Sequence, residues 1–265
     1  MTTISHIQEM LPFKIQPQER LSYILIGLWV MLMIGMPWLQ FFFGEAILPT
    51  GITLAAILQA SAVFYIVQLQ WGLKRTLITF AIVAVMTWGA EFIGHSTGLP
   101  FGDYHYTERL QPQILGVPLL IPIAWFMLLP SAWVMAQLIV GERDSWQKGI
   151  AYVLVSAIAL TVWDLFLDPQ MVAWGFWEWA NPSGYFGIPY LNYFGWLLVA
   201  SLVTLAVRPK ELKIFPLALI YGIVWFLQAV GQGMIWQQTG PALVGTVAMG
   251  GVMFLAYWRY RAYSA

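Results

Sequence analysis

The sequence predicts an all-α protein that crosses a membrane about eight times. Three observations predict this fold class: 60% of the 265 residues are hydrophobic, only 9% are charged, and long apolar runs recur along the chain. Soluble globular domains carry roughly 25% charged residues. This chain has too few polar side chains to cover a water-facing surface, so we expect one multi-pass helical domain over 21–258.

A spanning helix needs about 20 mostly apolar residues. Eight stretches meet this requirement, at about 21–41, 50–71, 76–95, 116–140, 149–167, 190–207, 214–234 and 241–258. The last two are separated by the polar stretch "QGMIWQQTGP", whose Gly and Pro predict a turn. The start of the chain is polar and shows no cleavable signal peptide, so we expect 1–20 to be a cytoplasmic segment and 259–265 a cytoplasmic tail.

The basic residues favour one orientation of these helices. Eleven of the twelve lysines and arginines, Lys14 among them, fall on the same side of the eight-helix arrangement, and only Arg109 falls on the other. The positive-inside rule then predicts a cell-membrane protein with both termini in the cytoplasm. The two long connections, 96–115 and 168–189, face the opposite side.

Several classes of function are disfavoured by what the sequence lacks. The absence of cysteine excludes disulfides, thiol nucleophiles and iron–sulfur ligation. A net charge of zero without a basic tract argues against nucleic acid as a partner. The chain has no dinucleotide fingerprint or P-loop, and no metal-ligand spacing links its histidines and acids. We therefore predict chemistry without a cofactor or a metal.

The two long connections resemble each other. "EFIGH" and "DLFLD" each place two ionisable residues four apart, and 73 residues separate Glu91 from Asp164 and His95 from Asp168. "GVPLLIPIAW" and "GIPYLNYFGW" then follow the two connections. Helices 3–4 and 5–6 are either a parallel repeat or a chance match, because Gly and Trp are common in this chain.

Two acids lie inside predicted membrane spans. Glu91 and Asp164 each come 16 residues after a cytoplasmic basic residue. At about 1.5 Å per residue they lie roughly 24 Å into a core of about 30 Å. Such residues are functional candidates because inserting them is costly, although a structural bond to a tryptophan N–H is the alternative. His95 and Asp168 lie one turn further out on the same helix faces.

Two further features of these connections carry open interpretations. The pair Asp168-Pro169 is also typical of a helix-ending turn. Asp103, in "PFGDYHYTERL", adds another carboxyl group on the same side. The aromatic residues there are either belt residues at the membrane interface or a wall that stabilises a cation. We predict a site near the non-cytoplasmic face.

The motifs "EFIGHSTGLPFGDYHYTERL", "GVPLLIPIAW", "WDLFLDPQMVAWGFWEW" and "GYFGIPYLNYFGW" resemble the CruF-type carotenoid hydratases. This family includes gamma-carotene 1′,2′-hydratases and bisanhydrobacterioruberin hydratases. The resemblance covers roughly 88–200 and implies a polytopic hydro-lyase that adds water to the terminal C-1′,2′ double bond of an acyclic carotenoid end. It also implies a carotenoid substrate, contact with membrane lipid, and carotenoid-pathway enzymes as candidate partners.

The chemistry of hydration suggests roles for the acids. Protonation of C-2′ leaves a tertiary cation at C-1′, to which water adds. A carboxylic acid that an apolar site keeps protonated can supply the proton. We expect Asp164 or Glu91 to be this acid, and His95, Asp168 or Asp103 to handle the water. The candidate substrate contacts are Tyr104, Tyr106, Trp125, Trp163, Trp177, Trp179, Tyr185, Asn192 and Trp196.

Two other classes remain as alternatives. Another carotenoid or isoprenoid enzyme, such as an end-group cyclase or isomerase, would use the same acid and cation. A proton-coupled transporter would also use buried acids, but it is expected to show inverted repeats and broken helices near the midplane. The parallel similarity of the two connections and the position of the acids near one edge favour an enzyme.

Overall fold

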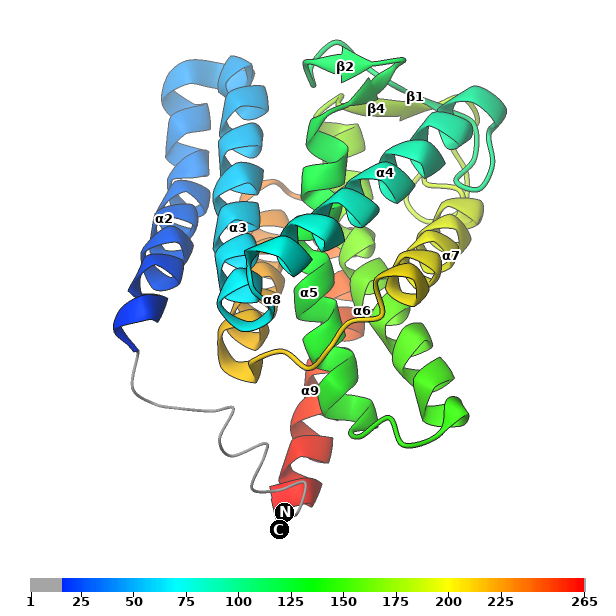
Figure 1. The fold of residues 1–265 in the computed structure, drawn as a ribbon. Coiled ribbons are helices and arrows are strands. Elements are labelled where there is room, and N and C mark those ends of the chain that lie inside the picture. Colours follow the sequence, from blue (N-terminus) through cyan, green and yellow to red (C-terminus); the bar gives the residue numbers. More distant parts are fainter. Residues whose placement is uncertain (1–15, 265) are drawn as a thin grey trace.

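Long helices account for most of residues 16–264, the part of the chain that the computed structural model describes (Figure 1). The helices are α2 (Arg20–Phe43), α3 (Leu48–Trp71), α4 (Leu73–Thr97), α5 (Leu120–Val140), α6 (Trp146–Ala173), α7 (Tyr190–Val207), α8 (Ile214–Val230) and α9 (Thr239–Ser264). The shorter elements are η1 (Pro17–Glu19), η2 (Gly44–Ile47) and the π-helical turn η3 (Gly231–Ile235). Of the expected segment 1–20, residues 1–15 with Lys14 lie outside the described residues.

The helices confirm the predicted fold class, an all-α polytopic membrane protein. Within 16–264, seven helical segments are long and apolar enough to cross a membrane, and the first of them, Pro17–Trp71, has 55 residues. A segment of that length measures roughly 80 Å, more than twice the thickness of a bilayer core of about 30 Å. Figure 1 shows why: the segment folds back at η2, and α2 and α3 lie side by side. The count of eight crossings stays a prediction.

The centre of the bundle is α5. Its most apolar stretch is 78% buried, a larger share than in any other spanning segment of the described chain. A helix that is apolar on all sides is expected in such a position. Trp133 links α5 to α3 and α7, because its ring stacks on Trp71 of α3 at 6.1 Å and its Nε1–H donates to Thr204 Oγ1 of α7 at 3.0 Å.

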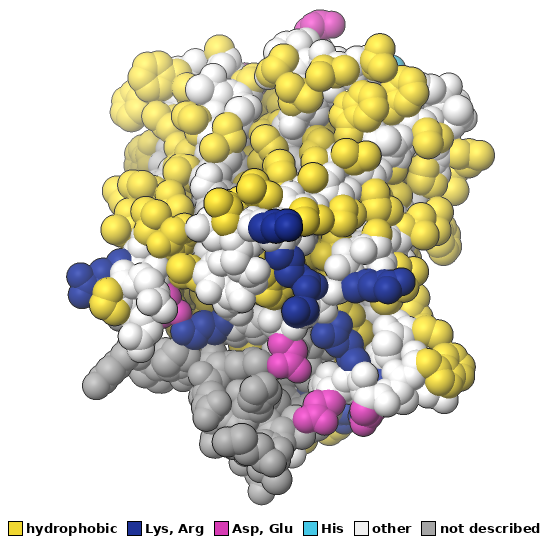
Figure 2. Space-filling model, in the orientation of Figure 1, with side chains coloured by type: hydrophobic (Ala, Val, Ile, Leu, Met, Phe, Trp, Pro, Cys, Tyr) yellow, Lys and Arg dark blue, Asp and Glu magenta, His cyan; other side chains and the backbone are white. Residues whose placement is uncertain are grey.

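The outer surface is apolar where lipid would cover it. Large hydrophobic side chains are exposed on different helices, among them Met31 on α2, Val85 on α4 and Phe254 on α9. Figure 2 shows hydrophobic side chains over most of one face, with Lys and Arg gathered in its lower half. The basic residues visible on this face thus lie toward the end of the bundle opposite the strands, which are at the top of Figure 1, whereas Arg109 contacts Glu45 and Phe176 at the strand end. The orientation in the cell stays a prediction.

The helix expected over 149–167 is longer than predicted. In the structure α6 continues through Asp168 and Pro169 to Ala173, so an end at residue 167 is wrong. Proline has no N–H and leaves the carbonyl four residues earlier without its helical partner. That carbonyl belongs to Leu165, and the Tyr185 hydroxyl donates to it at 3.1 Å. A side chain from the following loop therefore replaces the missing bond and lets the helix continue.

Short strands cover the end of the bundle where the predicted acids lie. Strand β1 (Tyr104–Tyr106) pairs antiparallel with β4 (Trp177–Trp179), and β2 (Gln113–Ile114) pairs with β3 (Val117–Pro118). The β1–β4 pair joins the two long connections, which are more than 70 residues apart in the sequence. It is this pairing that brings the two similar segments together.

The two similar segments share a local backbone conformation. Leu115 and Gly116 have φ values of 50° and 80°, and the matching Phe186 and Gly187 have 49° and 91°. A left-handed leucine or phenylalanine is uncommon, because the Cβ atom is crowded there. The parallel repeat stays a prediction, and these matching turns support it.

Candidate active site

Two aspartates of α6 share one partner on α7. Asp164 and Asp168 lie one turn apart, so their side chains point to the same face of the helix. The Asn192 amide Nδ2 donates to Oδ2 of both carboxyl groups, at 2.8 Å to Asp164. Trp177 Nε1–H donates to Asp168 Oδ1 at 3.0 Å. Asp164 is fully buried, and its Oδ1 has no hydrogen-bond partner among the described residues.

The third acid, Glu91 on α4, is held by two phenols. It is buried, and the hydroxyl groups of Tyr104 and Tyr106 both donate to its Oε2, Tyr106 at 2.8 Å. Burial, and then the neighbouring Glu91 carboxyl, raises the pKa of both tyrosines well above its usual value. Both phenols therefore keep their protons at neutral pH and act as donors to Glu91.

Strand alternation explains how two tyrosines reach one carboxyl group. Successive side chains of a strand point to opposite faces, so Tyr104 and Tyr106 face inward while His105 faces out. In the register of the pair, Tyr104 lies opposite Trp179 and Tyr106 opposite Trp177. On the outer face His105 lies opposite Glu178, with Nε2 and Oε2 3.7 Å apart and both side chains more than half exposed. Such an exposed pair contributes little to stability.

The acids meet at a small cavity, called the acid cavity below. It offers about 40 Å³ to the centres of water molecules, which is room for roughly three waters. Glu91 and Asp168 line it directly, whereas Asp164 lies behind Asp168 and does not. The lining residues are Glu91, Phe101, Tyr104, Tyr106, Ile121, Ala124, Trp125, Leu167, Asp168, Trp177, Trp179, Asn192 and Trp196.

Aromatic rings form most of the wall of the acid cavity. Trp125 of α5 and Trp196 of α7 stack with centroids 4.2 Å apart and planes within 11°. The strand residues pack in pairs as well, with Tyr104 and Trp179 at 5.1 Å and the ring of Tyr106 edge-on to that of Trp177 at 5.8 Å. Ring faces of this kind attract a positive charge.

The structure brings together most of the residues predicted from the sequence. The predicted residues that line the acid cavity or bind its acids are Glu91, Asp164, Asp168, Tyr104, Tyr106, Trp125, Trp177, Trp179, Asn192 and Trp196. Trp163 lies nearby, edge-on to Trp196 at 6.0 Å. It lines a neighbouring apolar cavity instead, which lies among α2, α3, α5, α6 and α8.

Three predicted residues lie away from the acid cavity. His95 is half-buried beside Gly116, with Nδ1 3.4 Å from the Tyr104 carbonyl oxygen. Asp103 is exposed, and only its backbone takes part in the strand region by accepting from the N–H of Ala180. Tyr185 donates its hydroxyl hydrogen to the Leu165 carbonyl oxygen of α6. Over residues 16–264 no group of three or more His, Asp or Glu residues is arranged to hold a metal ion.

The sequence analysis did not predict the apolar residues that line the acid cavity or the pairing of β1 with β4. Phe101, Ile121, Ala124 and Leu167 line the acid cavity, but nothing in the sequence distinguishes them from ordinary core residues. The strand pair had a detectable signal. "YHY" and "WEW" both alternate aromatic and polar residues, which is typical of short strands with one buried face.

The family comparison identifies the kind of protein that carries this site. Residues 51–252, about three quarters of the chain, match the family model described as carotenoid biosynthesis protein. The chain belongs to this family. It is therefore a membrane protein of the carotenoid biosynthesis family, and the site lies within the matched region.

A curated relative gives a more specific comparison. The chain is 34% identical over 133 residues to the bisanhydrobacterioruberin hydratase of Haloarcula japonica. This alignment covers 50% of the chain and 44% of the relative, so the chain spans less than half the length of that protein. No solved structure matches the chain.

Proposed function

We propose that the protein is a carotenoid hydratase, which adds water to the terminal double bond of an acyclic carotenoid end in the acid cavity. The observation that carries this proposal is the convergence of Asp168 and Glu91 on one small, aromatic-walled cavity. The family, and the name of the Haloarcula japonica relative, support the same activity. Acid-catalysed hydration needs a proton donor, a stabilised cation and a proton acceptor, and the cavity provides a candidate for each.

The proton donor is Asp168, with Asp164 behind it. Two carboxylates that share one amide donor in an apolar site strongly disfavour a second negative charge. A charged Asp164 would in addition leave its Oδ1 without a donor in a fully buried position. The pair therefore holds one proton. Asp164 passes this proton to Asp168, and Asp168 delivers it because Asp168 lines the cavity.

The proton goes to C-2′ of the alkene, whose π electrons form the new C–H bond and leave a tertiary cation at C-1′. The faces of Trp125, Trp177 and Trp196 surround this position and stabilise the charge, which exists only along the reaction path. A water molecule then forms the C–O bond at C-1′. No electrons are transferred to or from the protein, and the net reaction consumes one alkene and one water.

The proton acceptor is Glu91. Its Oε2 receives two phenol hydrogen bonds, which favour the ionised form of the carboxyl group. The water that attacks C-1′ loses its extra proton to Glu91 and becomes the tertiary hydroxyl group. Water in the cavity then returns this proton to the aspartate pair, so that the site is ready for the next substrate.

The test is expression in a bacterial host that makes an acyclic carotenoid, followed by mass spectrometry of the pigments. We expect products heavier by one water, and in D₂O one deuteron on carbon at C-2′. A cyclase or isomerase would leave the mass unchanged, and so would a transporter. Pigment of unchanged mass, with the protein present in the membrane, would refute the hydratase assignment.

Matched variants test the roles of the acids. Asp168→Asn and Glu91→Gln keep the shape of the side chains, and each should lower hydration by roughly 10²-fold or more. Asp103→Asn makes the same change at an exposed aspartate on the same end of the bundle and should leave hydration unchanged. Equal product from all three variants, at equal protein level, would show that the buried acids are structural.

A further inference from the structure

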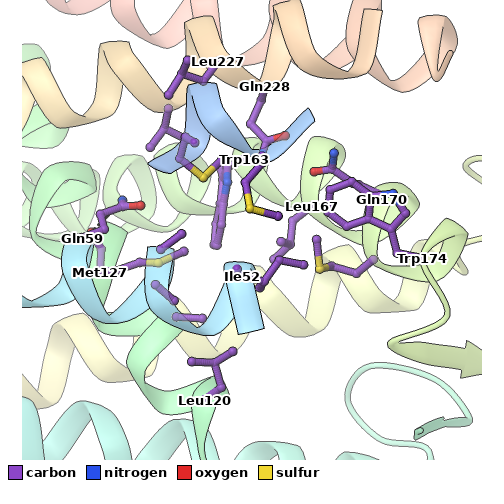
Figure 3. A pocket seen from close by; sticks show the side chains of 18 of the residues that line it. Ile52, Gln59, Leu120, Met127, Trp163, Leu167, Gln170, Trp174, Leu227 and Gln228 are labelled. Carbon is purple, nitrogen blue, oxygen red and sulfur yellow. Dashed lines mark hydrogen bonds between the residues drawn. The ribbon is translucent and has the colours of Figure 1, made fainter. Parts of the chain in front are cut away.

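A second cavity adjoins the acid cavity. This apolar cavity lies among α2, α3, α5, α6 and α8 and offers about 120 Å³ to the centres of water molecules, three times the space in the acid cavity. Figure 3 shows Trp163, Leu167 and Met127 around it, with Ile52 and Leu120 on the side of α3 and α5. Its wall is almost entirely hydrocarbon, thioether and indole.

Three glutamine amides interrupt this wall (Figure 3). Gln59 Nε2 donates to the Met127 carbonyl oxygen at 3.2 Å, and Gln228 Oε1 accepts from Gln232 at 3.1 Å. Gln170 differs from these two. It is almost fully buried, and its Nε2 has no hydrogen-bond acceptor among the described residues. This donor is available to an oxygen atom that enters the cavity.

Four residues belong to the walls of both cavities. They are Ile121 and Ala124 of α5, Leu167 of α6 and Trp177 of β4. We call them the partition. Trp177 also donates its Nε1–H to Asp168, so the partition is fixed to the acid. A chain that lies in the apolar cavity and passes the partition arrives at Asp168.

We propose that the apolar cavity binds the acyclic isoprenoid end of the carotenoid and passes its terminal double bond across the partition to the acid cavity. This inference rests on the proposed function for the identity of the substrate. Lipid is as apolar as the cavity wall, so moving the chain from one to the other brings no hydrophobic gain. Recognition must therefore depend on shape, and filling the cavity should weaken binding.

Ala55 of α3 offers a position to fill the cavity. It is buried and lines the apolar cavity, so Ala55→Phe would place a ring in the volume that the substrate occupies. Ala60 is the matched control on the same helix. It lines a different cavity, beside Phe64 and Phe80, and does not line the apolar or the acid cavity. Ala60→Phe therefore makes the same change in the same helix away from the proposed path.

The experiment measures binding and hydration separately. Purified protein in detergent is titrated with lycopene, an acyclic polyene, and binding is followed by the circular dichroism that the polyene band acquires in a chiral site. We expect Ala55→Phe to lower both this signal and hydration by roughly tenfold or more, because a bulky side chain excludes the ligand. Ala60→Phe should match the wild type. If Ala55→Phe does not accumulate, Ala55→Val should show a smaller loss of both.

The outcomes separate this inference from the proposed function. Suppose that wild type binds lycopene but adds no water to it, and that Ala55→Phe abolishes the binding signal. The hydratase assignment then fails and the binding site stands. If wild type hydrates the carotenoid and Ala55→Phe equals Ala60→Phe in binding and rate, the inference is wrong and the hydratase assignment stands. β-Carotene, whose two ends are rings, should give a much weaker signal than lycopene; an equal signal would also overturn the inference.

Discussion

Replacing Tyr106 by phenylalanine removes one hydroxyl group from the wall of the acid cavity. In the structure this hydroxyl donates to Glu91 Oε2 at 2.8 Å, next to a second bond from Tyr104 to the same oxygen. The ring of Tyr106 also packs edge-on against Trp177, and phenylalanine keeps that contact. The variant therefore tests the hydrogen bond to Glu91 and little else.

The size of the effect follows from the charge that Glu91 must carry. A hydrogen bond to a charged group contributes about 1.5–3 kcal/mol. At 1.36 kcal/mol per factor of ten, losing it should slow the hydration rate about 10- to 150-fold. Tyr104→Phe should have a similar effect. Because both phenols bind one oxygen atom, the remaining phenol partly compensates in each single variant, and the double variant should lose more than the product of the two single losses.

The pH dependence adds a check on the protonation state of the phenol. Burial and the Glu91 carboxyl raise the pKa of Tyr104 and Tyr106, so neither phenol ionises below the usual tyrosine value of about 10. The ratio of wild-type to Tyr106→Phe rates should therefore stay constant from about pH 6 to about pH 9. A ratio that shrinks as pH rises would mean that Tyr106 or its partner Glu91 titrates in this range.

A tyrosine on α7 provides the control. Tyr193 is half-buried, and its hydroxyl has no hydrogen-bond partner among the described residues. Tyr193→Phe should leave the rate of hydration within about twofold of wild type. The substitution removes no hydrogen bond to the described residues, and substitutions that remove no such contact usually have small effects. Initial rates are measured in liposomes that contain the carotenoid, at equal protein level. Equal rates for Tyr106→Phe, Tyr193→Phe and wild type would refute the role given to Glu91.

Three further predictions concern the supporting structure. Tyr185→Phe leaves the Leu165 carbonyl unpaired beside the proline, and should lower the free energy of unfolding by about 1–3 kcal/mol; thermal unfolding in detergent measures this, and an unchanged midpoint would contradict it. Asn192→Leu removes the donor shared by the two aspartates, and should slow hydration roughly tenfold or more with the protein still inserted. Reporter fusions after residues 110 and 180 should read as external; a cytoplasmic signal at either would reverse the predicted orientation.

The helices could be predicted from the sequence because lipid imposes a simple rule on them. Each span must be long, apolar and helical to satisfy its own backbone groups. The end of α6 could not be predicted this way. Local rules place a helix end near Pro169, and only the hydroxyl of Tyr185, from a loop that folds back on the helix, replaces the missing bond at Leu165.

The buried acids could also be predicted, because lipid makes polar groups costly, but their hydrogen-bond partners could not. A carboxyl group in a span stands out because burying it is costly, which identified Glu91 and Asp164. Proximity in the sequence then suggested His95, Asp168 and Asp103 as helpers. In the structure the alternation of β1 turns the neighbouring Tyr104 and Tyr106 inward to Glu91, while Asp103 stays exposed.

The two similar segments place a carboxyl group at matching positions, but the residues around the two carboxyl groups differ. Glu91 and Asp164 are 73 residues apart and lie on neighbouring sides of one site. One turn later the first segment has His95, which lies beside the Tyr104 carbonyl and does not line the acid cavity, and the second has Asp168, which joins Asp164 at Asn192. One side thus carries a single carboxyl group with two donors, suited to accept a proton, and the other a pair suited to hold one. The proposed hydration uses this difference, because in it the proton that adds to the alkene comes from the aspartate pair and the proton that leaves the water goes to Glu91.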